Sequence, residues 1–303
     1  MTLRPGILEE ISFNELQSLS WQARQSSRPQ VFEVVHPAGT VPVSVTGTSC
    51  SLQCSHCGGR YLEHMETIAT LDSVLARRNV TGILLSGGCN SEGQVPLLSK
   101  IDCIRRKISE SGQEVKINAH PGVVDKEEAL AIAGFASVIS FDFVLDDATI
   151  QEAFGGHRTA LDYVNAFRNL RKGKAKVVPH VLVGLYKGQV RGEYEAIEFL
   201  AREGIEELIF IVFIPTPRTR WEDVPPPQVN EVLRLVAWTR LRNPGLKITL
   251  GCMRPKGRYR EALDPACVMA GVDGIVLPHP LAVREAQSRG LRIIRKEECC
   301  AFD

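Results

Sequence analysis

The sequence has 303 residues, enough for one large domain, and it contains no long polar linker at which it would divide. Its 36 lysine and arginine residues balance 35 aspartate and glutamate residues, so bulk charge gives no reason to expect a nucleic-acid partner. It has no run of 18 apolar residues and no charged-then-apolar leader, so we expect neither a membrane span nor secretion. Nine cysteines in such a chain indicate metal ligands and buried thiols in a reducing, cytoplasmic compartment.

The chain opens with an amphipathic pattern and continues with strands that alternate with helices. A helix is predicted over residues 7–24. From residue 41 onward the alternation predicts parallel strands joined by right-handed crossovers. The strands are expected at residues 41–45, 82–86, 115–118, 137–143, 176–183, 207–213, 247–251 and 274–277. The intervening helices are expected at residues 66–78, 95–111, 126–133, 160–170, 193–203, 228–242 and 259–270.

The number of βα units predicts the fold class, which is α/β. Eight units are the number that closes a (β/α)8 or TIM-like barrel, so we favour a complete or nearly closed barrel over a doubly wound open sheet. Residues 1–40 would form an N-terminal helical extension, residues 41–280 the barrel, and residues 281–303 a tail that folds over the barrel mouth. In such barrels the chemistry lies at the C-terminal ends of the strands. Each strand end is therefore a candidate position for site residues.

Three cysteines stand directly after the first of these strands. Cys50, Cys54 and Cys57 have the spacing CxxxCxxC. Three thiolates on one loop can hold three irons of a four-iron cluster and leave the fourth iron open to a ligand that is not protein. The alternative is a zinc knuckle, in which His56 or His64 would supply a fourth ligand.

Polar residues and glycines also stand at the ends of later strands. The second strand ends in Ser86-Gly87-Gly88-Cys89, where two glycines let the backbone approach a ligand closely. Asp142 falls in a strand that should be buried, where an unpaired charge is costly. Either a ribose of a bound cofactor or a partner on a neighbouring strand would offset that cost. His120, at the end of the third strand, is more readily explained as a hydrogen-bonded histidine at the end of the barrel than as a catalytic residue.

Four further cysteines suit a second iron-sulfur cluster, provided that the tail folds across the mouth. Cys89 and Cys252 end the second and seventh strands, and Cys299 and Cys300 lie in the tail. Arg254 would neutralise the charge of such a cluster, because guanidinium stays protonated. Cys89 and Arg254 are therefore the candidate catalytic residues. The alternative is two mouth thiols and a loose tail, and a set that uses only one tail cysteine is a further variant.

The CxxxCxxC spacing, with His56 before the last cysteine, resembles the signature of the radical S-adenosylmethionine enzymes. The resemblance implies that the open iron binds S-adenosylmethionine, which the reduced cluster cleaves to a 5′-deoxyadenosyl radical. Ser86-Gly87-Gly88 resembles a motif that contacts the methionyl part, although Cys89 stands where many members have glutamate. Val183 and Gly184 are similar to an element that packs beside adenine. These residues, His56 and Asp142 are thus the expected cofactor-binding residues.

Residues 41–300 resemble the biotin-synthase-like group of that superfamily. More narrowly, residues 44–47, 58–62 and 251–255, with the Cys-Cys tail, are similar to the split lipoyl synthases, in which two radical proteins act in sequence. This resemblance implies that sulfur is inserted into an octanoyl chain on a carrier-protein lysine, with an auxiliary [4Fe-4S] cluster as sulfur donor. The implied partners are a lipoyl-domain or glycine-cleavage H-type carrier protein, a second radical protein of the pair, and a low-potential ferredoxin or flavodoxin.

Two other functions remain open. Another biotin-synthase-like radical enzyme would insert sulfur into a different substrate or rearrange a carbon skeleton, and the rearrangement would need no second cluster. A non-catalytic iron-sulfur or zinc protein would bind metal without cleaving S-adenosylmethionine. No nucleic-acid or membrane partner is expected in any of these cases.

Overall fold

The computed structural model describes residues 11–156 and 158–302. They form two compact units. The described part of the first unit comprises residues 11–36, His180–Pro215 and Val224–Lys296, and that of the second comprises the remainder of Pro37–Pro179, Thr216–Asp223 and residues 297–302. Strand β7 (Lys176–Val183) begins in the second unit and ends in the first. Within the described residues, no helix combines the length and the apolar character that crossing a membrane requires.

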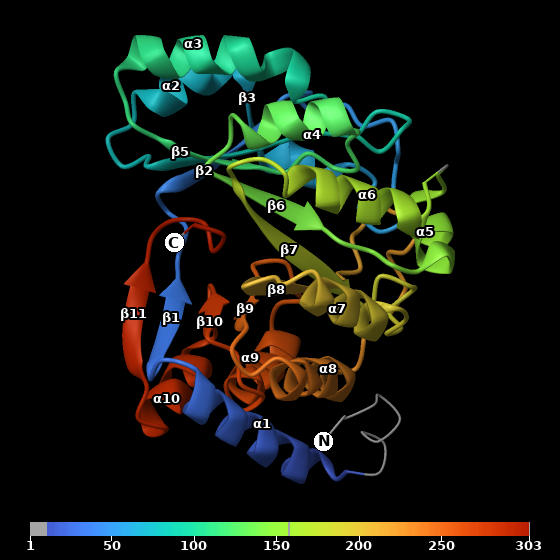
Figure 1. The fold of residues 1–303 in the computed structure, drawn as a ribbon, viewed down its shortest axis with the longest axis vertical. Helices are drawn as coiled ribbons and strands as arrows, with labels where there is room; N and C mark the ends of the chain where they lie inside the picture. Colours follow the sequence, from blue (N-terminus) through green and yellow to red (C-terminus); the bar gives the residue numbers. More distant parts are fainter. Residues whose placement is uncertain (1–10, 157, 303) are drawn as a thin grey trace. The chain divides into compact units, whose positions relative to one another are not determined.

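In the first unit, helices and strands alternate along the sequence (Figure 1). Its helices are α1 (Phe13–Ser27), α7 (Glu193–Arg202), α8 (Val229–Arg242), α9 (Arg258–Met269) and α10 (Pro280–Ser288). Its strands, besides the end of β7, are β1 (Val31–Val35), β8 (Glu207–Val212), β9 (Lys247–Leu250), β10 (Gly274–Val276) and β11 (Arg292–Lys296). The strands pair in parallel in the order β11-β1-β10-β9-β8-β7.

The second unit is also built from parallel strands and helices. Its strands, besides the start of β7, are β2 (Thr40–Ser44), β3 (Glu66–Thr67), β4 (Gly82–Ser86), β5 (Lys116–Ala119) and β6 (Val138–Asp142), paired in the order β6-β5-β4-β2-β3. Its α-helices are α2 (Leu71–Leu75), α3 (Ile101–Ser111), α4 (Lys126–Ala133), α5 (Asp147–Phe154) and α6 (Ala160–Leu170). The unit also contains the short 3-10 helices η2 (Arg60–His64), η3 (Ile68–Thr70) and η4 (Leu98–Lys100).

Helix α1 is an integral part of the first unit and packs against α8 and α9 (Figure 1). It begins after Ser12, whose hydroxyl oxygen accepts the N–H of Glu15 and so satisfies one of the free donors of the first turn. Arg24 is buried, and its Nη2 lies 3.7 Å from Oδ1 of Asp273, a residue that Arg240 also contacts at 2.7 Å. The helix predicted over residues 7–24 is thus confirmed from residue 13, and residues 7–10 lie outside the described residues.

All eight predicted strands are present, and the described residues contain three more. Strand β1 pairs with β10 on one side and β11 on the other, so residues 1–40 contribute a strand as well as a helix. Residues expected in the tail form α10 and β11. Strand β11 lies at a sheet edge and carries Arg292, Arg295 and Lys296. Charged side chains at an edge discourage pairing with another chain. Those charges conceal the strand in the sequence pattern.

The helix predicted over residues 66–78 is shorter than expected. The segment instead forms β3, η3 and α2 in succession. Thr67 and Thr70 cap each other, and the N–H of Thr67 donates to Oγ1 of Thr70 at 3.0 Å. Threonine hydroxyls that bond the nearby backbone compete with a helix, and β-branched side chains lose freedom within one. A regular helix therefore begins only at Leu71.

A parallel α/β fold is confirmed, whereas closure into a complete (β/α)8 barrel is not. Strand β3 pairs with β2, and β11 pairs with β1. Neither has a second strand neighbour among the described residues, so both are edge strands. Strand β3 has only two residues, so its free edge offers few unpaired N–H and C=O groups to another chain.

Candidate functional site

The cysteine loop, residues 46–60, follows β2 in the second unit. The N–H groups of Cys57 and Gly58 both donate to the carbonyl oxygen of Cys54, at 3.2 and 2.8 Å. Gln53 and Gly58 have φ angles of 46° and 50°. Glycine reaches this left-handed region without steric cost, so Gly58 suits the turn directly after the last cysteine. The turn brings the thiols of Cys54 and Cys57 into hydrogen-bonding contact.

Helix α5 anchors the cysteine loop at Ser55. The N–H of Ser55 donates to the carbonyl oxygen of Ala153 at 2.7 Å, and its hydroxyl donates to that of Glu152 at 2.9 Å. The ring of His56 meets Phe154 edge-on, with centroids 5.8 Å apart. These contacts fix the middle of the loop to the end of a regular helix. His56 is therefore held beside the cysteines by packing.

The contact between Cys54 and Cys57 favours a thiolate on Cys57. The hydrogen bond from the Cys54 thiol, opposed by burial and assisted by His56, lowers the pKa of Cys57 to about 4. The same bond, followed by burial, raises the pKa of Cys54. Iron and zinc bind the thiolate form of cysteine. The loop thus presents one ligand already in the form that metal requires.

Cys89 lies in the same neighbourhood as the cysteine loop. Burial, followed by the negative charges of Cys50, Cys57 and Asp142, raises the pKa of the Cys89 thiol to about 12. A backbone hydrogen bond also joins the two segments, since the N–H of Ser51 donates to the carbonyl oxygen of Cys89 at 2.8 Å. The second unit therefore brings a fourth thiol close to the three predicted cluster ligands.

The end of β4 packs against the start of the cysteine loop. The carbonyl oxygen of Ser86 accepts the N–H of Val45 at 2.8 Å. A Cβ atom added to Gly87 would lie 3.1 Å from Oγ1 of Thr46 and 3.1 Å from the side chain of Val45. Ser86 and Gly87, both predicted to bind the cofactor, thus lie at the base of the loop.

Gly88 is required for a close contact between two backbone segments. A Cβ atom on Gly88 would lie 1.9 Å from the carbonyl oxygen of Ser49 and 2.6 Å from Cα of Cys50. The N–H of Gly88 donates to Oγ1 of Thr46 at 2.7 Å. The sequence predicts that this glycine admits a ligand, whereas in the structure it admits the backbone of the cysteine loop. Thr46, to which the sequence assigned no role at the site, completes the contact.

Asp142 has a partner on the neighbouring strand. It ends β6, and its Oδ2 lies 3.2 Å from Nε2 of His120, which follows β5. Burial lowers the pKa of His120, but the charge and hydrogen bond of Asp142 outweigh it and the pKa is raised. Of the two explanations for a carboxylate here, the neighbouring partner is present. The Asp142 side chain is 47% exposed, so the carboxylate is not fully enclosed by the protein.

The tail lies against the amino-terminal ends of strands in the second unit. The N–H of Cys299 donates to Oγ1 of Thr40, the first residue of β2, at 2.8 Å. The ring of Phe302 covers Gly82, the first residue of β4. The cysteine loop follows the opposite end of β2, so the tail differs from the expected cover over the carboxyl ends. The side chain of Cys299 reaches inward, where Nδ2 of Asn118 donates to its Sγ at 3.3 Å.

The two tail cysteines have different surroundings. A hydrogen bond from Cys300, opposed by burial and assisted by the N–H of Ala301 and by Asn118, lowers the pKa of Cys299 to about 6. Cys300 is buried, with 8% of its surface exposed. Cys299 is thus the better placed metal ligand of the pair. Asn118 was missed, although a polar residue inside a buried strand is the signal that identified Asp142.

Val183 and Gly184 lie at the end of β7 in the first unit. Gly184 has a φ of 79°, and a Cβ atom there would lie 2.8 Å from the ring of Pro227. Its N–H donates to Oε1 of Glu193 at 2.8 Å. Val183 is fully buried. Packing within this unit therefore accounts for both residue types.

Arg254 has a structural role in the first unit. Its side chain is fully buried, and its Nε and Nη2 bind both carboxylate oxygens of Asp264 at 2.8 and 2.7 Å. Its Nη1 donates to the carbonyl oxygens of Gly251 and Val276, at 2.6 and 2.9 Å. The guanidinium thus joins the ends of β9 and β10. Its predicted role beside a second cluster stays a prediction. Cys252, two residues earlier, is exposed.

The donor chemistry of the cysteine loop fits an iron-sulfur cluster. Three cysteines on one loop, one of them held as a thiolate, match the ligands that such clusters use. Within residues 11–156 and 158–302, no three His, Cys, Asp or Glu side chains converge in the geometry of a single metal ion.

Solved structures share the fold at low sequence identity. Methylornithine synthase (PylB) matches with a TM-score of 0.66 and 14% identity over 97% of this chain and 95% of that chain. The [FeFe]-hydrogenase maturase HydG matches with a TM-score of 0.70 and 14% identity over 96% of this chain and 71% of that one. HydG from Carboxydothermus hydrogenoformans matches with a TM-score of 0.61 and 16% identity, over 89% and 68%.

At this level of identity the likeness shows the fold. Radical S-adenosylmethionine enzymes are among the solved structures that share it. No protein-family model matches the sequence, and no curated protein matches it.

Proposed function

We propose that this protein is a radical S-adenosylmethionine enzyme whose [4Fe-4S] cluster is held by Cys50, Cys54 and Cys57. The carrying observation is that these three cysteines share one tightly turned loop in which Cys57 is favoured as a thiolate. When bound, the reduced cluster supplies the electron that cleaves S-adenosylmethionine and generates a 5′-deoxyadenosyl radical. The shared fold with radical S-adenosylmethionine enzymes supports the proposal.

The chain's own residues would seat the cofactor around the cysteine loop. Gly87 and Ser86 lie at the base of the loop and would face the methionyl part, as the resemblance of their motif implies. The half-exposed carboxylate of Asp142 would accept hydrogen bonds from ribose hydroxyls while His120 balances its charge. The assignment of Val183 and Gly184 to the adenine side rests on the resemblance of their strand alone.

Replacing Cys50, Cys54 and Cys57 together by alanine is expected to abolish 5′-deoxyadenosine formation, because no thiolate of the loop remains to hold iron. Anaerobically prepared wild-type protein should contain at least about four irons with equal sulfide, and the triple variant should lose about four. The matched control is Cys103→Ala, which removes a thiol from helix α3. Undiminished 5′-deoxyadenosine from the triple variant would contradict the proposal.

Within this class, we propose that the enzyme inserts sulfur into an octanoyl chain on a lysine of a lipoyl-domain or H-type carrier protein. A second [4Fe-4S] cluster, held by Cys89, Cys252 and the tail cysteines, would be the sulfur donor. The low pKa of Cys299 supports this residue as a ligand, and Cys89 lies beside the cysteine loop. Because the tail is attached to the first residue of β2, at the end opposite the cysteine loop, this ligand set requires the tail to move. A second radical protein would act in sequence with this one. A low-potential ferredoxin or flavodoxin would supply electrons.

The second cluster predicts that its ligands can be removed separately from the first. Cys252→Ser, and in another variant Cys299→Ser with Cys300→Ser, should each lose about four of about eight irons. Both should still form 5′-deoxyadenosine, but neither should transfer sulfur to an octanoyl-lysyl peptide. Iron and sulfide content, 5′-deoxyadenosine and product mass are the measurements. A full iron complement in both variants would rule out the second cluster.

The position of the tail favours a second candidate. Because Cys299 is held by Thr40 at the amino-terminal end of β2 and by Asn118 within β5, the tail position agrees with a radical enzyme that has no sacrificial cluster. Such an enzyme would rearrange a carbon skeleton and transfer no sulfur. Wild-type protein with about four irons, full 5′-deoxyadenosine formation and no sulfur transfer would support this candidate over sulfur insertion.

A further inference from the structure

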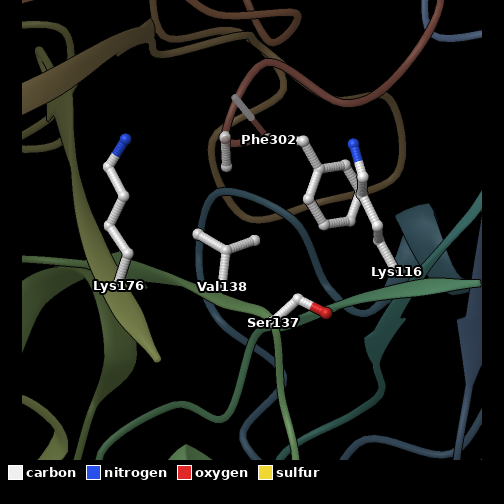
Figure 2. Close-up of a pocket in the computed structure, with 6 residues that line it drawn as sticks. Lys116, Ser137, Val138, Lys176 and Phe302 are labelled. Atoms are coloured by element: carbon white, nitrogen blue, oxygen red, sulfur yellow. The ribbon is translucent and has the colours of Figure 1, made fainter. Parts of the chain in front are cut away.

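A pocket of about 220 Å³ lies where the tail meets the starts of β5, β6 and β7 in the second unit (Figure 2). Its lining includes Lys116 and the ring of Phe302. Nζ of Lys116 pairs with Oε2 of Glu298, a tail residue, at 2.6 Å. This pocket thus belongs to the attachment of the tail. Parallel α/β sheets bind their ligands at the opposite, carboxyl ends of the strands, where a substrate contact is expected instead.

The carboxyl ends of β9 and β10 lie side by side in the first unit. Nη1 of Arg254 donates to the carbonyl oxygens of Gly251 and Val276, at 2.6 and 2.9 Å. Cys252 and Leu277 directly follow these two residues in the sequence. The loops after β9 and β10 therefore begin next to each other, one with an exposed cysteine and the other with an exposed leucine.

Leu277 has a backbone conformation that a leucine rarely adopts. Its φ is 49°, and 41% of its surface is exposed. In this left-handed region the Cβ atom crowds the following carbonyl oxygen, so glycine or asparagine is the usual residue. The fold holds the conformation, because the N–H of Leu277 donates to the carbonyl oxygen of Val35 at 2.8 Å and its own carbonyl accepts Nη2 of Arg254 at 3.2 Å. A strained and exposed leucine at a strand end points to a contact outside the chain.

Arg260 lies beside Leu277 and has hydrogen-bonding capacity to spare. Its Nη1 lies 3.4 Å from the carbonyl oxygen of Leu277, and its Nη2 lies 3.4 Å from that of Arg254, both longer than a typical hydrogen bond. Among the residues that the structure describes, no atom accepts a hydrogen bond from its buried Nε. A buried donor without a partner is costly and calls for an explanation. A guanidinium held by such long bonds can turn toward an acceptor oxygen of a bound molecule.

Leu277 and Arg260 together match the two parts of an acyl amide. An alkyl chain gains roughly fourfold in affinity for each methylene group that it buries, and an amide oxygen accepts a hydrogen bond from a guanidinium. The octanoyl-lysine of the proposed substrate has both parts, and Cys252 beside them is a proposed ligand of the sulfur-donating cluster. We infer that Leu277 contacts the octanoyl chain and that Arg260 donates to its amide oxygen. This inference rests on the proposed sulfur insertion.

The first test measures the binding of octanoyl-lysyl and butanoyl-lysyl peptides to anaerobically prepared holoenzyme without reductant, so that no turnover is needed. The wild type should bind the octanoyl peptide at least about tenfold more tightly than the butanoyl peptide. Leu277→Asn, which suits a positive φ, should reduce this preference to about threefold or less. The matched control is Leu161→Asn, the same exchange at a leucine that is 64% exposed on α6, and it should keep the wild-type preference.

The second test separates the amide contact from the chain contact. Arg260→Met should weaken the binding of both peptides by a similar factor, about tenfold or more, because both carry the amide oxygen. The matched control is Arg258→Met, which removes an exposed guanidinium from the same turn of α9 and should leave binding unchanged. General damage to the fold would not remove chain-length preference in one variant and amide affinity in the other.

Three outcomes would overturn the inference. They are wild-type protein that binds neither peptide, Leu277→Asn that keeps the wild-type preference for the longer chain, and Arg258→Met that weakens binding as much as Arg260→Met. Chain-length preference that depends on Leu277, without any sulfur transfer, would support the contact and contradict sulfur insertion alone. Sulfur transfer with an unchanged chain-length preference in Leu277→Asn would overturn the contact and leave the proposed function standing.

Discussion

Replacing Gly88 by alanine is expected to lower the iron bound at the cysteine loop to well below half of the wild-type content. The added methyl group would lie 1.9 Å from the carbonyl oxygen of Ser49 and 2.6 Å from Cα of Cys50, so backbone must move. Forcing extra atoms into a well-packed contact typically costs about 1–3 kcal/mol. Here the strain is relieved by displacing the segment that carries the first cluster ligand. Iron content and 5′-deoxyadenosine formation are the measurements.

Gly245→Ala is the matched control for this substitution. No atom lies within 4 Å of a Cβ placed on Gly245, so the same methyl group meets open space. The control should keep its full iron content and its 5′-deoxyadenosine activity. If Gly88→Ala binds iron normally and only its affinity for S-adenosylmethionine falls, Gly88 faces the cofactor and our account of its contact with Cys50 is wrong.

Replacing Asp264 by alanine is expected to destabilise the first unit by about 3–5 kcal/mol, the typical cost of leaving a buried charge without its partner. Arg254 and Asp264 are both fully buried, and their carboxylate and guanidinium groups make two hydrogen bonds of 2.7 and 2.8 Å. Oδ2 of Asp264 also accepts the N–H of His279 at 2.8 Å, and the substitution removes that bond too. Urea unfolding followed by circular dichroism measures the loss.

The double variant Arg254→Met with Asp264→Leu tests whether the unpaired charge is the cause. Exchanging a buried ion pair for apolar residues of similar volume removes the unpaired charge, so the double variant should be more stable than Asp264→Ala. It should remain less stable than the wild type, because the carbonyl oxygens of Gly251 and Val276 and the N–H of His279 lose their partners. Iron content should remain at the wild-type level in the folded double variant. If it instead keeps its stability but loses about four irons, Arg254 acts at a second cluster, as the sequence alone suggested.

The strands were the most predictable part of the fold. Strand β7 was predicted at its observed bounds, because its run of valines is short, rich in β-branched residues and bounded by a glycine turn and a helical pattern. Strand β11 was missed, since arginine and lysine at an exposed edge erase the apolar pattern on which such predictions depend. Closure of a barrel was not predictable from the number of units, because pairing at the edges is decided by residues far apart in sequence.

The candidate site was predictable where ligands lie close together in sequence. Cys50, Cys54 and Cys57 share one loop because their spacing leaves the chain little choice. For Arg254 the sequence did not show the partner Asp264, which lies on the following helix, and only the packed structure shows that the guanidinium is paired. Gly88 was recognised as a place of close approach, but the sequence did not identify which segment approaches it.

The place of β1 between β10 and β11 has a consequence for how the chain folds during synthesis. Residues 31–35 can pair only after residues 274–296 have been made, so both sides of β1 wait for about 240 residues. At roughly 5–20 residues per second, that delay is on the order of 10–50 s. During it, an apolar strand with unpaired N–H and C=O groups is exposed to other chains. Expression at a high level, with many unfinished chains present at once, should therefore favour aggregation through residues 31–35. A lower rate of translation initiation should reduce this aggregation.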